Sequence, residues 1–184
     1  MNLLFALLEK WDRKRKIALL KNHKNCFLKG NIKIGLQNQF ILYPNLKRVS
    51  IGADFDCRNQ VQLLVQNDAE LVIEDRVFMN NFCSVNCLMS ITIGENTLFG
   101  ENVKLYDHNH AYQKNPDFKI SHSEFTKAPI KIGNNCWLGS NVVVLKGVTI
   151  GDNCIIGAGC VIYKDVPANS TVVNHQNLQY QSHL

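Results

Sequence analysis

Two histidines separated by one residue could do acid–base chemistry in this chain. They are His108 and His110, in the sequence DHNH that begins at Asp107. Residues two apart in an extended stretch face the same side, so both imidazoles would point the same way. An imidazole with an ordinary pKa of ~6.5 is mostly neutral at pH 7 and can accept a hydroxyl proton. The pair is therefore a candidate for general-base chemistry, and Asp107 is in a position to orient an imidazole.

These histidines lie in a long polar interruption of an otherwise regular pattern. The segment 106–129 contains two prolines and three of the six histidines, the third being His122. Such a long loop within a regular architecture is usually functional. We expect it to leave the fold from one corner and return there. The remaining histidines, like His122, are expected to be bystanders: His23, His175 and His183.

The pattern on either side of this loop is a repeat with a period of six. From Ile130 to Asp165 an aliphatic residue returns at every sixth position: Ile132, Leu138, Val144, Ile150, Ile156 and Ile162. A period of six fits neither a helix nor a plain strand, and indicates short flat pieces joined at corners. Three such hexads make one coil, and stacked coils give a triangular prism with three short parallel sheets.

The repeat is less regular before residue 70. Ile34-Gly35 and Ile51-Gly52 read as corners seventeen residues apart, which is close to three hexads. Between Ile73 and Ile93 the spacing is twenty residues, which predicts a two-residue bulge. The sequence thus predicts three domain segments: an N-terminal amphipathic basic helix (1–30), a β-helix (31–173, with the loop 106–129) and a tail (174–184).

The seven cysteines are explained by the same repeat. Their number is odd and no CxxC pair occurs, which argues against a disulfide framework and a zinc ribbon. Four of them fall on a second, small inward position of the hexad, where a free cysteine acts as a small hydrophobe: Cys83, Cys136, Cys154 and Cys160. Reduced thiols favour a cytoplasmic location.

The N-terminal segment, residues 1–29, combines an apolar stripe with a basic cluster. Residues 3–20 are expected to be helical, with apolar residues along one side: Leu3, Leu4, Leu7, Leu8 and Trp11. One interpretation is a helix that caps the open end of the repeat. The other is an interfacial helix that contacts an anionic membrane at its inner face. Neither a convincing signal peptide nor a membrane-spanning run is found.

The net charge of +5 also originates in the N-terminal segment. Residues 1–29 hold eight Lys or Arg residues and two acidic residues, a net charge of +6, which leaves −1 for the rest. The basicity therefore belongs to one terminal segment and does not indicate a nucleic-acid-binding face on the repeat body, so no nucleic-acid partner is expected.

The run from Ile132 to Pro167, preceded by DHNH in a loop, resembles the hexapeptide-repeat O-acetyltransferases. These include galactoside, maltose and nodulation-factor acetyltransferases and those of O-antigen and capsule synthesis. The resemblance covers about residues 70–173. It implies an all-β, left-handed parallel β-helix, an exception to the usual right-handed crossover. It also implies a homotrimer that binds acetyl-CoA between neighbouring subunits and requires no metal.

The resemblance also implies roles for individual residues. His110 matches the catalytic base, and the backbone amide of Ser140 matches the group that stabilises the oxyanion. Trp137 matches a tryptophan near the acetyl end of the pantetheine arm. The acceptor-binding candidates are Asn80, which matches a family asparagine, with His108 and Asp107. Apart from the resemblance, the small residues Gly139, Gly157 and Ala158 would let a coenzyme arm approach the backbone, and Lys146 and Lys164 are candidates to meet CoA phosphates.

The sequence departs from the family after Val172. The usual GVPAK-like segment that closes over the coenzyme is replaced by VVNHQNLQYQ, which lacks the proline and the basic residue. The resemblance therefore does not extend to how the adenine and 3′-phosphate ends of CoA are held.

Together these features predict a CoA-dependent O-acetyltransferase that acts on a saccharide, in surface polysaccharide or lipopolysaccharide synthesis. The basic amphipathic start would fit a lipid-linked acceptor. One alternative is an acetyltransferase for a small free acceptor such as an amino sugar, a serine or an antibiotic. A second is a non-catalytic β-helix scaffold, against which the DHNH loop argues. A zinc carbonic anhydrase needs three histidine ligands, and His108, His110 and His122 lack its spacing.

Overall fold

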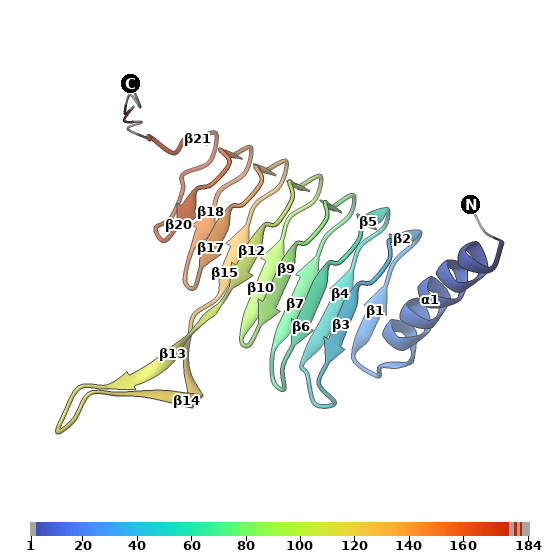
Figure 1. The fold of residues 1–184 in the computed structure, drawn as a ribbon, viewed down its shortest axis with the longest axis horizontal. Helices are drawn as coiled ribbons and strands as arrows, with labels where there is room; N and C mark the ends of the chain where they lie inside the picture. Colours follow the sequence, from blue (N-terminus) through green and yellow to red (C-terminus); the bar gives the residue numbers. More distant parts are fainter. Residues whose placement is uncertain (1–2, 177–178, 180, 182–184) are drawn as a thin grey trace.

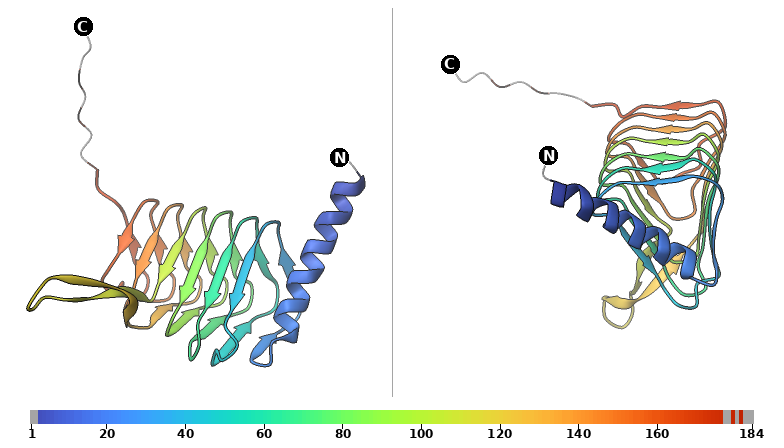
Figure 2. Two further views of the ribbon diagram at one scale, coloured as in Figure 1. Left: turned by 60° about the horizontal axis from the view of Figure 1, so that its bottom comes forward. Right: turned by 90° about the vertical axis from the view of Figure 1, so that its right-hand side faces the viewer.

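The computed structural model describes residues 3–176, 179 and 181 of the chain. They form a triangular prism of parallel strands, with a helix at one end and a hairpin that projects from one corner (Figures 1 and 2). Each coil contributes one strand to each of three sheets, which we call faces A, B and C in chain order. About six coils make up a left-handed parallel β-helix, which confirms the stacked coils that the repeat predicts and the fold that the resemblance implies.

The faces consist of short strands in register. Face A contains β1 (Cys26–Leu28), β4 (Arg48–Ile51), β7 (Glu70–Ile73), β10 (Ser90–Ile93), β15 (Ile130–Ile132) and β18 (Thr149–Ile150). Face B contains β2 (Ile32–Ile34), β5 (Phe55–Cys57), β8 (Phe78–Met79), β11 (Leu98–Phe99), β16 (Trp137–Leu138), β19 (Ile155–Ile156) and β21 (Thr171–Val172). Face C contains β3 (Gln39–Leu42), β6 (Gln62–Val65), β9 (Ser84–Cys87), β12 (Lys104–Tyr106), β17 (Val143–Leu145) and β20 (Val161–Ile162).

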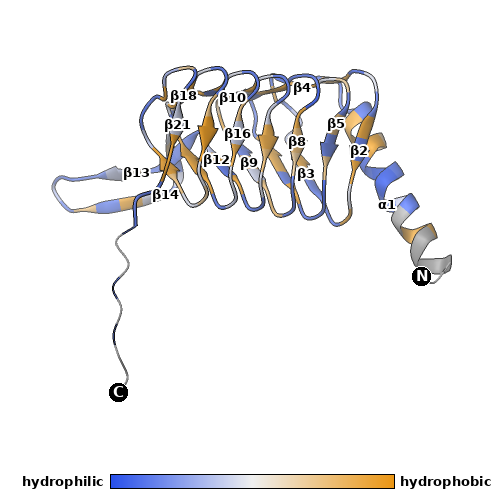
Figure 3. Ribbon diagram, turned by 90° about the horizontal axis from the view of Figure 1, so that it is seen from above, coloured by the Kyte–Doolittle hydropathy of each residue, from blue (hydrophilic) through white to orange (hydrophobic). Residues whose placement is uncertain are grey.

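A continuous apolar column fills the prism. The hexad residues from Ile132 to Ile156 are at most 1% exposed, and Ile162 is 5% exposed. The strand residues that colour as hydrophobic in Figure 3 recur from coil to coil, whereas the corners are largely hydrophilic. The aliphatic residue that returns every six residues is therefore confirmed as the inward residue of each strand.

The cysteines belong to this column, as the hexad predicts. All seven are free thiols, and six of them are buried. Burial raises the pKa of Cys57 to about 12 and the pKa of Cys83 to about 11. Because the thiolate is the reactive form, these side chains are inert at neutral pH and serve packing.

The first coils are longer than the later ones, which corrects the sequence-based reading of their corners. Val49 pairs with Leu71 in the next coil, whereas Ile132 pairs with Ile150, so more residues separate successive coils near the start of the prism. Ile34 therefore lies on face B and Ile51 on face A, so these two are not equivalent points of successive coils. The extra residues are accommodated at the corners, where they leave the strand register intact.

The corners depend on residues that tolerate a left-handed backbone. Asn96, Asn135, Asn153 and Asn169 all have φ between 55° and 61° at one corner. Asparagine adopts this conformation more readily than most residues. Their side-chain amides also bond from coil to coil, at 3.1, 3.2 and 2.9 Å. The ladder supports the stacking outside the apolar column.

Helix α1 (Leu3–Asn22) lies across the open N-terminal end of the prism (Figure 2). Leu20 is buried and Ile17 packs against the core, so the second half of the helix caps the first coil as one interpretation predicted. Leu7, Leu8 and Trp11, in the first half, are 55–61% exposed. No helix among the described residues is long and apolar enough to cross a membrane.

The described elements refine the segment boundaries. Strand β1 pairs with β4, so the β-helix begins at Cys26, before the expected boundary at residue 31. The excursion is a hairpin of β13 (His108–Gln113) and β14 (Lys119–Lys127), within the expected 106–129. Most of the tail after residue 176, including His183, lies outside the described residues, as do the side chains of Leu3 and Leu4.

Neighbouring isoleucines of β19 offer a test of the apolar column. Ile156 is completely buried, whereas Ile155 points outward and is 42% exposed. We expect Ile156→Ala to lower the free energy of unfolding by about 2–5 kcal/mol, since it leaves a cavity in the core. Ile155→Ala should cost less than about 1 kcal/mol. Urea unfolding followed by circular dichroism measures both, and equal effects would contradict the assignment of the inward face.

Candidate active site

The DHNH sequence occupies the neck and first strand of the hairpin. The chain leaves face C at Asp107 and returns at Ala128, whose N–H donates to the Asp107 carbonyl at 2.9 Å. His108 and His110 lie in β13, opposite Lys127 and Phe125 of β14. Both imidazoles contact the Phe125 ring, with centroids 5.3 and 4.7 Å away. The expectation that they face the same side is met.

Asp107 has mainly a structural role. Its side chain is completely buried, and its carboxylate accepts three backbone N–H groups of the preceding coil, from Leu88, Met89 and Ser90, at 2.7–3.0 Å. It also accepts from Nδ1 of His108 at 3.2 Å. Charge-assisted bonds of this kind are strong. Asp107 therefore orients His108, but its burial leaves no room for direct contact with an acceptor.

His110 has the geometry of a general base. Its Nδ1–H donates to the carbonyl oxygen of Ser121 at 3.1 Å, while the side chain as a whole is exposed. A proton held at Nδ1 leaves the lone pair on Nε2, the atom free to accept a proton. Phe125 fixes the plane of the ring from one side.

Ser121 and Phe125 were missed by the sequence reasoning. Ser121 acts through its carbonyl, which has no sequence signal, and Phe125 is identified only by the hairpin register.

Several other candidate residues lie at or beside the corner between faces B and C, which we call the B–C corner. Asn80, Gly139 and Gly157 follow directly on β8, β16 and β19, and Ser140 follows Gly139. Trp137 points outward from face B and is 53% exposed, in register with Leu98 and Ile155 of the coils on either side. The structure thus brings these residues onto one edge of the prism.

A ladder of side chains runs along the B–C corner as far as Ser140, with one interruption at Asn81, whose N–H donates to Asn80 Oδ1 at 2.8 Å. In each of three coils a corner N–H donates to the side-chain oxygen of the residue one coil further on. These bonds are Leu36 to Asn59 at 2.7 Å, Asn59 to Asn81 at 3.2 Å and Glu101 to Ser140 Oγ at 3.2 Å.

The residue one coil beyond Ser140 is Ala158, which has no side-chain oxygen. Among the described residues, no hydrogen bond uses the Ser140 N–H as donor. That N–H is left available on the edge, as an oxyanion donor has to be.

The small residues of this edge have a structural cause. A Cβ on Gly139 would lie 2.7 Å from the Ala158 nitrogen, and one on Gly157 would lie 3.1 Å from the Val172 carbonyl oxygen. Close stacking of coils therefore requires glycine at Gly139 whether or not a coenzyme arm approaches. Ala158 itself is exposed.

Lys146 and Lys164 lie at another corner, between faces C and A, which is also where the hairpin leaves the prism. The Lys164 ammonium lies 5.7 Å from the centroid of the Tyr163 ring. Within the described part of the chain, neither lysine forms an ion pair. His110 and Ser140 are thus held at different corners, and one chain does not bring them together.

Comparison with known proteins agrees with this architecture. Residues 129–164 match the family described as "Bacterial transferase hexapeptide (six repeats)". The chain is 28% identical over 130 residues to the putative lipopolysaccharide biosynthesis O-acetyl transferase WbbJ of Escherichia coli, covering 67% of this chain and 66% of that protein. It is 45% identical over 84 residues to the galactoside O-acetyltransferase of the same organism, covering 44% and 38%. The chain thus spans less than two thirds of the length of both relatives.

A solved structure shows the same fold. A hexapeptide-repeat acetyltransferase of Vibrio cholerae, complexed with acetyl-CoA, superposes with a TM-score of 0.58 at 22% identity, covering 87% of this chain and 72% of that one. This likeness establishes the fold alone. By its repeat, its fold and its named relatives, the chain is similar to the hexapeptide-repeat acetyltransferases, and residues 129–164 match the repeat of that family.

Proposed function

We propose that the protein transfers acetyl from acetyl-CoA directly to a saccharide hydroxyl, with His110 as the general base. The observation that carries the proposal is the hydrogen bond from Nδ1 of His110 to the Ser121 carbonyl, which leaves Nε2 of this exposed side chain to accept a proton. Such a base contributes typically ~10²–10⁴-fold to a proton-transfer step. The relatives named as O-acetyltransferases support the reaction class.

In the proposed step, His110 and the Ser140 amide account for the proton and for the charge on the carbonyl oxygen. Nε2 of His110 takes the proton of the acceptor hydroxyl as its oxygen attacks the thioester carbonyl carbon. Negative charge develops on the carbonyl oxygen, which accepts a hydrogen bond from the Ser140 N–H. As the C–S bond breaks, His110 returns the proton to the departing sulfur. No covalent enzyme intermediate is required.

The proposal places the reaction between two copies of the chain. His110 and Ser140 of one chain lie at different corners, so the base of one copy would meet the B–C corner of another. A homotrimer, as the family resemblance implies, closes this arrangement into a ring. In it, Trp137 would lie beside the acetyl end of the coenzyme, and Lys146 and Lys164, from the corner of His110, would meet CoA phosphates.

The acceptor is proposed to be a glycan of surface polysaccharide or lipopolysaccharide synthesis, at the cytoplasmic side of the membrane. Asn80 and His108 are the proposed acceptor contacts. Asn80 lies at the same B–C corner as Ser140, and His108 lies beside His110 in β13. Asp107 is removed from this set because it is buried.

Membrane contact is proposed through the exposed residues of α1 between Leu7 and Arg15. Its exposed apolar residues Leu7, Leu8 and Trp11 are followed by exposed Arg13, Lys14 and Arg15, the last 5.3 Å from the Trp11 ring centroid. Lys16 does not take part, since it is buried and paired with Asp12. Apolar anchors beside basic groups suit an anionic bilayer surface.

The catalytic role of His110 is tested by substitution. We expect His110→Ala to lower kcat by about 10²–10⁴-fold with acetyl-CoA and a glycan acceptor, measured as free thiol release. His122→Ala, an exposed histidine of the same hairpin, is the matched control and should retain activity. Undiminished turnover by His110→Ala would overturn the mechanism. A panel that includes free amino sugars and serine distinguishes the small-acceptor alternative.

The oxyanion assignment has its own test at Ala158. The Ala158→Ser substitution supplies the oxygen that the ladder lacks, and its hydroxyl would accept the Ser140 N–H as Ser140 accepts the N–H of Glu101. We expect kcat to fall by about 10–10²-fold, and the larger effect would correspond to the loss of one oxyanion donor. The melting temperature should stay unchanged. Ala168→Ser, at another exposed corner, is the control. Equal kcat for both variants would exclude the Ser140 amide as the oxyanion donor.

The membrane proposal is tested by vesicle sedimentation. Each basic residue near an anionic surface contributes about 1 kcal/mol, so replacing Arg13, Lys14 and Arg15 by Ser should weaken binding to phosphatidylglycerol vesicles by at least about 10-fold. The control replaces three hairpin lysines by Ser and removes the same charge: Lys114, Lys119 and Lys127. If both triple variants bind vesicles like the parent protein, α1 is not a membrane anchor.

A further inference from the structure

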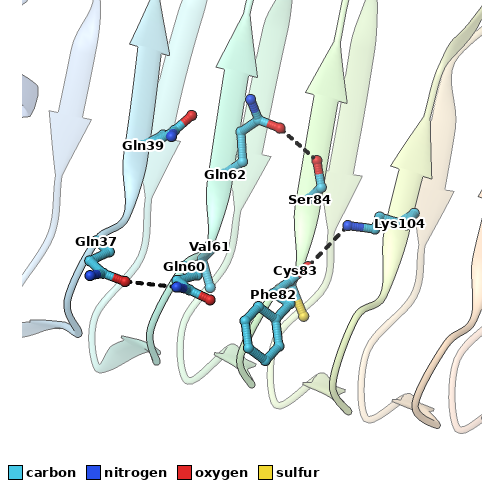
Figure 4. A pocket seen from close by; sticks show the side chains of 9 residues that line it. All are labelled: Gln37, Gln39, Gln60, Val61, Gln62, Phe82, Cys83, Ser84 and Lys104. Atoms are coloured by element: carbon cyan, nitrogen blue, oxygen red, sulfur yellow. Dashed lines mark hydrogen bonds between the residues drawn. The ribbon is translucent and has the colours of Figure 1, made fainter.

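A polar hollow of about 490 Å³ lies on face C beside the B–C corner, in the first four coils (Figure 4). Its floor is formed by outward side chains of consecutive strands and its rim by corner residues. Glutamine amides line most of it, from Gln37, Gln39, Gln60 and Gln62, together with Phe82 and Lys104. None of these residues belongs to the proposed catalytic set.

Hydrogen bonds within the hollow hold the amides in place and leave complementary groups available. Gln60 Nε2 donates to Gln37 Oε1 at 2.7 Å, so Gln60 presents its oxygen and Gln37 its NH₂. The Ser84 hydroxyl donates to Gln62 Oε1 at 3.1 Å, so Gln62 presents its NH₂. Donors and acceptors therefore alternate along the wall. A sugar hydroxyl is both donor and acceptor, and neighbouring hydroxyls fit this alternation.

Phe82 is the unusual residue of the rim. Its φ is 65°, in the left-handed region, where a bulky side chain is an outlier. The equivalent position in the next two coils is asparagine, Asn102 and Asn141, with φ of 59° and 61°. Phe82 is nevertheless 49% exposed, and its carbonyl accepts from Lys104 Nζ at 3.1 Å. Core packing does not explain an exposed aromatic ring in a strained conformation, which points to a binding role.

The hollow lies on the same edge as Ser140. Phe82 is two coils before Ser140 at the B–C corner, and Asn81 beside it is bonded to Glu101, which is bonded to Ser140. At about 4.8 Å per coil, the two corners are about 10 Å apart along the prism, roughly the reach of two linked sugar residues.

The hollow also extends toward α1. A neighbouring groove shares Gln39 with it and is lined by Arg15 and Leu19 of the helix. The hollow therefore lies between the proposed membrane-facing helix and the proposed oxyanion site.

We propose that this hollow binds the glycan chain of the acceptor, one or two residues away from the sugar that is acetylated. This inference rests on the proposed function. The amides bond to hydroxyl groups, and the Phe82 ring packs against the apolar face of a pyranose. Among the described residues that line the hollow, Lys104 alone is charged, so a uronic acid carboxylate is accepted as well as a neutral sugar. The hollow thus selects an oligosaccharide over a monosaccharide.

Direct binding tests the site independently of acetyl transfer. The His110→Ala protein is titrated calorimetrically with maltohexaose, chitohexaose and hexagalacturonic acid. We expect at least one to bind, and Phe82→Asn and Gln60→Ala each to weaken its binding by at least about 10-fold. Phe82→Asn places asparagine where the next two coils already have it, so folding is preserved. Phe27→Ala, a similarly exposed ring on face A, is the control.

Kinetics with the otherwise unchanged protein give the second readout. With the hexasaccharide that binds, Phe82→Asn should raise KM by at least about 10-fold, while kcat and the KM for the corresponding monosaccharide stay unchanged. Binding of no hexasaccharide, or equal binding by the parent and both hollow variants, would overturn the inference. Phe82-dependent binding without any acetyl transfer would instead refute the proposed function and leave the hollow as a glycan site.

Discussion

The stacking of coil on coil is the constraint on which the rest of the structure depends. Each strand inside a sheet bonds to the strands one coil before and after it, and each corner must end its turn without leaving buried backbone groups unpaired. The chain meets this requirement with polar side chains that accept the N–H of the preceding coil, such as Asn134 for Glu95 at 3.0 Å. The apolar column stabilises the stack, and the corners determine its register.

The candidate functional features lie where the pattern of one side-chain oxygen for one corner N–H is not followed. Ser140 keeps an available N–H because Ala158 has no side-chain oxygen to accept it. Asp107 does the opposite and accepts three backbone groups at once, which anchors the point where the hairpin leaves. Phe82 occupies a position that the next coils give to asparagine. Each departure places a polar or aromatic group where regular stacking would not require it.

A rigid prism also separates functions along its length. Helix α1 closes the N-terminal end, the hollow follows on the first four coils, and the hairpin leaves after β12. This order suits an acceptor that extends from a membrane surface toward the edge of Ser140. The separation of His110 and Ser140 by one face explains why a site of this kind would be completed by another copy of the chain.

The sequence by itself predicted a solenoid of stacked coils with one loop, because a period of six matches neither a helix nor a plain strand, and the resemblance implied the left-handed parallel β-helix. Ile132 to Ile162, the four hexad cysteines and the excursion at 106–129 could all be read from spacing alone. It also named His110 and Ser140, through a motif and a resemblance. The first coils were read less well, since Ile34 and Ile51 look equivalent in sequence but lie on different faces.

Only the tertiary structure decided which groups are available. The burial of Asp107, the Ser121 carbonyl on His110 and the end of the ladder at Ala158 depend on residues that are far apart in sequence and adjacent in the fold. The same holds for the hollow, whose glutamines come from separate coils. Spacing reports which side of a strand a residue faces, but hydrogen-bond partners are set by register between coils, and register varies with corner length.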